Sequence, residues 1–148
     1  MASSKPDALT QATRLLASTD KTAAQLIAAL ARRGHSQVEI DGALERARAL
    51  GYLDDRRVAA KKAKDDLRAG WVGEALLARL TATGLDEAVA RSAVKDAIAE
   101  SGWSALDAAR RLVTARKLTG AKAARFLASR GFEEDVVERV IGSGGGEI

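Results

Sequence analysis

Residues 26–34 read LIAALARRG, and related stretches return as LLARLTATG at residues 76–84 and AARFLASRG at residues 123–131. The three closing glycines are separated by 50 and 47 residues, and a leucine lies four positions before each of them. A period of this length, in a chain whose apolar residues recur at helical spacing, is typical of a small helical unit that stacks on copies of itself. The sequence therefore predicts an all-α fold of three tandem three-helix repeats in an elongated, curved, solenoid-like arrangement.

The boundaries of the helices follow from capping residues and glycines. Thr22 and Gln25 have the spacing of a capping box, and Ser36, Asp86 and Ser104 are placed to cap later helices. A glycine after the last apolar residue of a helix commonly ends it in a left-handed conformation, so the closing glycines are expected to have positive φ angles. The chain divides into a flexible N-terminal arm (1–8), repeat 1 (9–53), repeat 2 (54–101), repeat 3 (102–141) and a flexible C-terminal tail (142–148).

The core is expected to be built from alanine and leucine. Hydrophobic residues make up 47% of the chain but aromatic residues only 3%, which favours close helix–helix packing through small side chains. Leu30, Leu80 and Leu127, four positions before the closing glycines, lie on the apolar face of the middle helix of each repeat. These three leucines are therefore predicted to be buried.

Composition limits the functions open to the chain. Its 148 residues carry a net charge of +4 and include no cysteine and a single histidine, which excludes disulfides and thiolate metal sites. No apolar run is long enough to span a bilayer, and no signal-peptide pattern, Walker-type loop, GxSxG or HExxH motif is present. We expect a cytoplasmic monomer that is not an enzyme, holds no cofactor and works through an extended binding surface.

The aromatic residues and one pair of acids each admit two interpretations. Tyr52, Trp71 and Trp103 lie near boundaries between helices, where they either stack on nucleic-acid bases or pack one helical unit against the next; packing is favoured. Asp54 and Asp55 resemble paired carboxylates for Mg²⁺ or acid–base chemistry, but their position before a helix favours a cap and a first-turn acid.

Basic residues are concentrated in the window from Ala108 to Phe132, which contains no acid. They are Arg110, Arg111, Arg116, Lys117, Lys122, Arg125 and Arg130. Such a surface can contact phosphates without reading sequence, or acidic side chains of a protein partner. The alternative is a solvated pair of helix faces, and we favour an interaction surface.

A second acid-free stretch runs from Arg56 to Lys64. Arg57, Lys61 and Lys64 share one helix face at i, i+4 and i+7, and the pair at residues 65–66 adds two acids directly after them. This face is a second candidate for partner or nucleic-acid binding, and a solvated face is an equally good interpretation.

Several short motifs resemble the RecX family of bacterial regulatory proteins. They are GYLDD at residues 51–55, the glycine break near Gly70 and RFLASRGF at residues 125–132, and the resemblance spans about residues 9–141. The chain departs from the family pattern at residues 56–58, which read RRV, and at residues 72–73, where Val-Gly replaces a strong helix cap.

The resemblance implies a cytosolic, non-enzymatic modulator of the RecA recombinase. Proteins of this family lie in the groove of the RecA–single-stranded DNA filament and restrain its growth, strand exchange, ATPase and coprotease activities. This links the chain to DNA repair, recombination and the SOS response. The alternative function is a general nucleic-acid-binding repeat protein that holds the phosphate backbone through the same basic faces.

Overall fold

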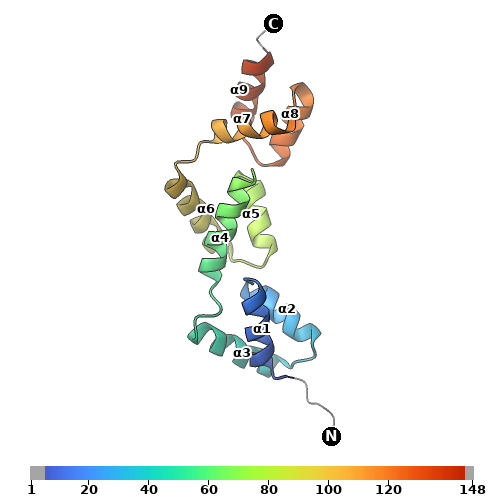
Figure 1. The fold of residues 1–148 in the computed structure, drawn as a ribbon, viewed down its shortest axis with the longest axis vertical. Coiled ribbons are helices and arrows are strands. Elements are labelled where there is room, and N and C mark those ends of the chain that lie inside the picture. The colour runs from blue at the N-terminus through green and yellow to red at the C-terminus, as the bar shows by residue number, and fades with distance from the viewer. Residues whose placement is uncertain (1–5, 146–148) are drawn as a thin grey trace.

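A computed structural model describes residues 6–145, and within this part of the chain every regular element is a helix (Figure 1). The helices are α1 (Ala8–Ser18), α2 (Ala23–Arg32), α3 (Gln37–Ala49), α4 (Asp55–Arg68), α5 (Gly73–Ala82), α6 (Glu87–Ser101), α7 (Ala105–Arg116), α8 (Gly120–Ser129) and α9 (Glu134–Gly145). They form repeat 1 (α1–α3), repeat 2 (α4–α6) and repeat 3 (α7–α9), which confirms the predicted all-α fold.

The predicted caps are present. Thr22 Oγ1 accepts a hydrogen bond from the N–H of Gln25 at 3.1 Å, and the Gln25 side chain accepts one from the N–H of Thr22 at 3.0 Å, which completes the capping box. Ser36, Asp86 and Ser104 likewise accept bonds from the first turns of α3, α6 and α7. Local hydrogen-bonding chemistry therefore determines where most of these helices begin.

The glycines that close α2, α5 and α8 have the predicted backbone conformation. The φ angles of Gly34, Gly84 and Gly131 are +87°, +92° and +101°. Each glycine follows a helix whose final carbonyls accept bonds from the residues beyond it, as in other helices that end at a left-handed residue. The predicted ends of these three middle helices are therefore correct.

Ordered structure extends further toward both ends of the chain than predicted. Asp7 caps α1 by accepting the N–H of Thr10 at 2.7 Å, and Ala8 is buried, so these residues belong to repeat 1 rather than to a flexible arm. At the other end α9 continues to Gly145, into the stretch assigned to a flexible tail. The remaining residues of the predicted arm and tail, 1–5 and 146–148, lie outside the described residues.

The repeats follow one another along an elongated, curved molecule, with repeat 1 and repeat 3 at opposite ends (Figure 1). Within each repeat the first and third helices pack together, as α1 with α3, α4 with α6 and α7 with α9. The middle helices α2, α5 and α8 follow one another along the chain of repeats. The C-terminal end of α5 meets the N-terminal end of α2, and that of α8 meets the N-terminal end of α5.

The hydrophobic core is divided unevenly among the repeats. Repeats 2 and 3 share one cluster, in which Leu80 and Leu127 are fully buried. Repeat 1 has its own cluster around Leu30. Its junction with repeat 2 includes polar contacts, from Thr22 Oγ1 to the carbonyl of Thr83 at 2.5 Å and from the N–H at residue 23 to the carboxylate at residue 55 at 2.8 Å.

This division predicts that repeat 1 unfolds separately. The two tryptophans, Trp71 and Trp103, lie in repeats 2 and 3, whereas far-UV circular dichroism reports on all helices. We expect the circular dichroism transition in urea to begin at a lower denaturant concentration than the tryptophan fluorescence transition, because the smaller, separate core opens first.

Leu30→Ala provides the internal control for this prediction. Because Leu30 belongs only to the core of repeat 1, its truncation should move the early circular dichroism phase and leave the fluorescence midpoint in place. Superimposable transitions from the two probes would show that all three repeats unfold as one unit.

Candidate interaction surface of the third repeat

The basic residues of the predicted window lie on α7, on α8, on the short turn between them and, for Arg130, directly after α8. Arg110, Arg111, Lys117, Lys122 and Arg125 are all exposed. Within residues 6–145 none of these five has a carboxylate within salt-bridge distance. Their charges are therefore available to a partner at this end of the molecule.

The fold distributes these charges over three neighbouring hollows. Lys122 and Arg125 line a shallow depression of about 550 Å³, together with Arg116. Arg110 and Lys117 line a groove of about 570 Å³ beside α9. The fifth exposed basic residue, Arg111, lines a larger groove of about 650 Å³ between repeats 2 and 3. One window of sequence thus gives a broad basic surface rather than a single pocket.

Arginines and aromatic rings alternate in a stack that joins repeat 2 to repeat 3. Arg79 lies 4.4 Å from the centre of the Trp71 ring, and Arg130 lies 4.2 Å from the same ring. Arg130 is also 5.0 Å from the Phe126 ring, which has Arg116 at 4.6 Å. Guanidinium groups over aromatic faces are attracted by the ring quadrupole, so the stack holds the two repeats together.

Arg130 is the centre of this junction. Its guanidinium donates to the carbonyl of Ala69 at 3.2 Å, and its own carbonyl accepts the N–H of Val72 at 2.9 Å. Burial lowers the pKa of Arg130, and the nearby positive charges of Arg116 and Arg79 lower that pKa further. An arginine nevertheless stays charged, and here it serves the contact between repeats.

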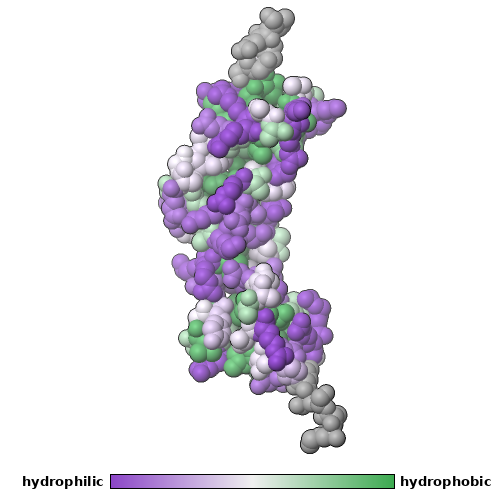
Figure 2. All heavy atoms as spheres, in the orientation of Figure 1, coloured by the Kyte–Doolittle hydropathy of each residue, from purple (hydrophilic) through white to green (hydrophobic). Residues whose placement is uncertain are grey.

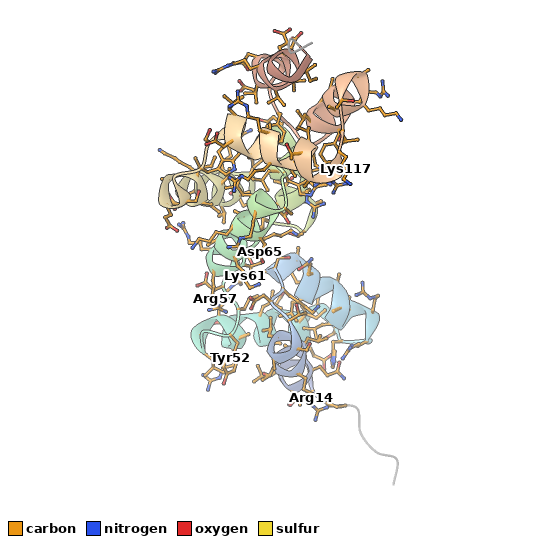
Figure 3. All side chains as sticks on the ribbon, turned by 45° about the horizontal axis from the view of Figure 1, so that its top comes forward. Arg14, Tyr52, Arg57, Lys61, Asp65 and Lys117 are labelled. Carbon is orange, nitrogen blue, oxygen red and sulfur yellow. The ribbon has the colours of Figure 1, made fainter. Side chains whose placement is uncertain are left out.

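The basic face predicted on α4 is largely compensated within the chain. The guanidinium of Arg57 donates to two backbone carbonyls, those of residues 51 and 52, each at 3.2 Å. Lys61 pairs with Asp65 at 3.2 Å, and Lys64 pairs with the carboxylate of residue 100 at 3.1 Å. Figure 3 labels Arg57, Lys61 and Asp65, which follow one another along α4. Such exposed pairs add little stability, but they reduce the field that a partner would meet.

Comparison with known proteins shows the family of the chain. No protein-family model matches the chain. The chain is 38% identical over 127 residues to a protein of Thermus thermophilus named Regulatory protein RecX, and the match covers 85% of this chain and 84% of that one. The chain belongs to the RecX family. A RecX protein of Syntrophotalea carbinolica is 37% identical over 93 residues, which span 62% of this chain and 61% of that protein.

A solved structure supports the same RecX fold. The crystal structure of RecX from Lactobacillus salivarius superimposes with a TM-score of 0.72 over 92% of this chain and 93% of that one, at 14% sequence identity. The three-repeat helical architecture is therefore that of the family. As a RecX-family member the chain is a regulatory protein rather than an enzyme.

The aromatic residues of this RecX-family chain divide between packing and exposure. Trp71 lies in the arginine stack, and Trp103 is half-buried in the groove between repeats 2 and 3, as the packing interpretation predicts. The packing interpretation is wrong for Tyr52, which is 47% exposed. The neighbouring Leu53 is 4% exposed and belongs to the core of repeat 1. The N–H groups of both residues donate to the carbonyl of Ala47 in the turn that closes α3.

Two buried polar groups lie outside the predicted sites. Asp66 is buried and accepts hydrogen bonds from Arg79, with Lys62 3.5 Å away. His35 is also buried, with its Nε2 3.0 Å from Oε1 of Gln11, which fits packing at the helix junction. Because Asp66 and Arg79 are 13 residues apart, on different helices, no local pattern indicates that they pair.

Asp54 and Asp55 act as structural acids. Asp54 accepts the N–H groups of Arg56 and Arg57 at 3.0 and 3.3 Å, which confirms the predicted cap of α4. Asp55 is the acid in the first turn of α4, as predicted, and its carboxylate also accepts the N–H of Ala23 in repeat 1 at 2.8 Å. None of the helices within residues 6–145 is long and apolar enough to cross a membrane.

Proposed function

We propose that this RecX-family protein binds the RecA–single-stranded DNA filament in its groove and restrains the recombinase, ATPase and coprotease activities of the filament. Membership of the RecX family shows that the chain is a regulatory protein. This role belongs to the cytoplasm and to DNA repair, recombination and the SOS response.

The observation that supports a contact through repeat 3 is its group of five exposed basic residues, at positions 110, 111, 117, 122 and 125, which have no acidic partner within residues 6–145. A filament presents both phosphates and acidic side chains, and a surface of one charge sign increases the rate of encounter with either. The face on α4 is the weaker part of the proposal, because Arg57, Lys61 and Lys64 already have partners in the chain. We therefore place the principal contact on α7 and α8.

Reversing the five charges should separate binding from folding. With Arg110, Arg111, Lys117, Lys122 and Arg125 each changed to Glu, we expect the rate of association with preformed filament to fall by about tenfold or more at low salt. Inhibition of the filament ATPase and of strand exchange should fall in step, since the protein contributes no chemistry of its own. Surface plasmon resonance and an ATPase titration measure the two effects.

A control with the same change in net charge is available in repeat 1 and in the first turn of α4. Arg14, Arg32, Arg46, Arg48 and Arg56 are also exposed, and the described residues contain no acidic partner for them. Reversing these five to Glu should leave most of the binding intact. If this control loses binding and the repeat 3 variant does not, the contact lies on repeat 1 or the start of α4.

Salt dependence distinguishes filament recognition from direct binding of the nucleic-acid backbone. Contacts to phosphate alone weaken steeply as salt rises, whereas a protein groove retains affinity through apolar and hydrogen-bonded contacts. We expect affinity for the filament to exceed that for bare single-stranded DNA and to persist at a salt concentration that abolishes the latter. Equal affinity and equal salt slopes would favour a general nucleic-acid-binding protein.

A further inference from the structure

The chain uses one type of junction twice to join its middle helices. At the first junction the carbonyl of Thr83, at the end of α5, accepts the hydroxyl of Thr22 at the start of α2, at 2.5 Å. At the second, the carbonyl of Arg130, at the end of α8, accepts the N–H of Val72 at the start of α5, at 2.9 Å. In both cases the carbonyl belongs to the residue before the closing glycine.

In repeat 3, the residues at the start of α8 have the same backbone conformation as the residues at the start of α5, where the end of α8 docks. Val72 has φ −142° and ψ 168°, and Thr119, at the start of α8, has φ −140° and ψ 161°. The next residues are Gly73 at φ +53° and Gly120 at φ +57°. At Gly73 a β-carbon would lie 2.9 Å from the carbonyl oxygen of Gly131, so the docked helix end requires the glycine.

No part of residues 6–145 occupies the equivalent place beside Gly120. A β-carbon there would meet nothing within 4 Å. Thr119 makes no side-chain cap, and neither its hydroxyl nor its N–H has a hydrogen-bond partner in the described chain. The adjoining groove of about 570 Å³ has apolar walls at Leu118, Val113 and Ile141, and the basic residues Arg110 and Lys117 also line it. Figure 2 shows apolar surface at this end of the molecule.

The other end of the molecule carries the matching helix end. Arg33, the last residue before the closing glycine of α2, has φ −87° and ψ 4°, and Gly34 is exposed with φ +87°. Arg130 has φ −87° and ψ −5°, and Gly131 has φ +101°. The two ends also share the sequence Arg-Gly. Repeat 1 therefore presents the shape that the junction inside the chain already accepts.

We propose that two copies of this protein associate head to tail, with the C-terminal end of α2 from one copy docked in the groove beside Thr119 of the next. The carbonyl of Arg33 then accepts a hydrogen bond from Thr119, and Gly34 lies against Gly120. The same contact repeated by each added copy gives an open chain rather than a closed dimer, because the two surfaces differ.

The contact is expected to be weaker than the junction inside the chain. Inside the chain Leu112 packs directly on Gly70. A β-carbon added at Gly70 would lie only 2.7 Å from the methyl groups of Leu112. The corresponding residue of repeat 3 is Lys117, also left-handed with φ +56°, and its side chain keeps an incoming first helix at a greater distance. A small interface of this kind implies a dissociation constant of about 1 mM, so the protein is a monomer in dilute solution.

Three asparagine substitutions test this proposal. Gly120→Asn blocks the groove, Gly34→Asn blocks the helix end, and Gly102→Asn is the control. Asparagine tolerates left-handed backbone better than other residues with a β-carbon. Gly102 has φ +63° and open space around it, at neither end of the molecule. Circular dichroism and thermal unfolding verify that each variant is folded.

Sedimentation equilibrium up to about 1 mM protein is the measurement. The weight-average mass of the wild type and of Gly102→Asn should rise with concentration, whereas Gly34→Asn and Gly120→Asn alone should remain at the monomer mass. An equal mixture of the two blocked variants should associate again, but no further than dimers, because each retains one intact end.

Three results would overturn the proposal. The first is a wild type of constant mass across the range. The second is association by both blocked variants alone, which would place the contact elsewhere. The third is a lowered melting temperature for Gly120→Asn but not for Gly102→Asn, which would show that a segment of the same chain fills the groove. The measurement uses the isolated protein, so its outcome is independent of the proposed binding to the filament.

Discussion

Leu80→Ala is expected to lower the free energy of unfolding by about 2–5 kcal/mol. Leu80 is fully buried in the cluster shared by repeats 2 and 3, and its truncation removes apolar contacts and leaves a cavity that packed helices do not readily close. Leu127→Ala acts on the same cluster and Leu30→Ala on the separate core of repeat 1, so all three should be strongly destabilised. Chemical denaturation followed by circular dichroism measures each change.

Leu50→Ala is the matched control for this series. Leu50 is 43% exposed at the end of α3, so the same chemical change there should cost well under half as much as at Leu80. If the three core variants unfolded close to the wild type, the packing of the middle helices would not be the source of stability.

Gly131→Ala is expected to have the second large effect, a loss of about 3 kcal/mol or more in unfolding free energy. The left-handed backbone, with φ +101°, makes any β-carbon unfavourable. The added carbon would also collide with the carbonyl oxygen of Val72 and lie 3.0 Å from the β-carbon of Ala75. The substitution should therefore both strain α8 and force apart the junction between repeats 2 and 3.

Gly102→Ala separates these two causes. Gly102 also has a positive φ angle, +63°, but a β-carbon there meets nothing within 4 Å, so only the backbone strain of about 1–2 kcal/mol remains. Gly131→Ala should in addition change the fluorescence of Trp71, because Arg130 and Trp71 are in contact. Equal losses for the two variants, with unchanged fluorescence, would mean that the junction has room to adapt.

Features that depend on neighbours within about four residues were predictable from the sequence. The capping box of Thr22 and Gln25, the cap at Asp54 and the left-handed Gly131 all arise from hydrogen bonds and backbone sterics inside one short segment. Burial of Leu80 followed from apolar residues recurring at helical spacing. The period of the repeat then gave the fold class.

The candidate site was only partly predictable. The basic window was visible as a run without acids, but its division over three hollows depends on how α7, α8 and α9 pack. Arg130 belonged to that window by sequence and lies instead between two aromatic rings, with its hydrogen-bond acceptor at Ala69, 61 residues away. Likewise Lys64 is compensated by Glu100 on another helix.

The helices, their ends and the number of repeats therefore follow from the amino-acid sequence, because the interactions that specify them act between residues close in the chain. Which basic residues of the described chain lack an acidic partner depends on the tertiary structure. It also decided that Tyr52 faces outward while Leu53 is buried, and that repeats 2 and 3 share a core that repeat 1 does not enter. These outcomes depend on contacts between residues far apart in the chain, whose partners are set only when the helices dock.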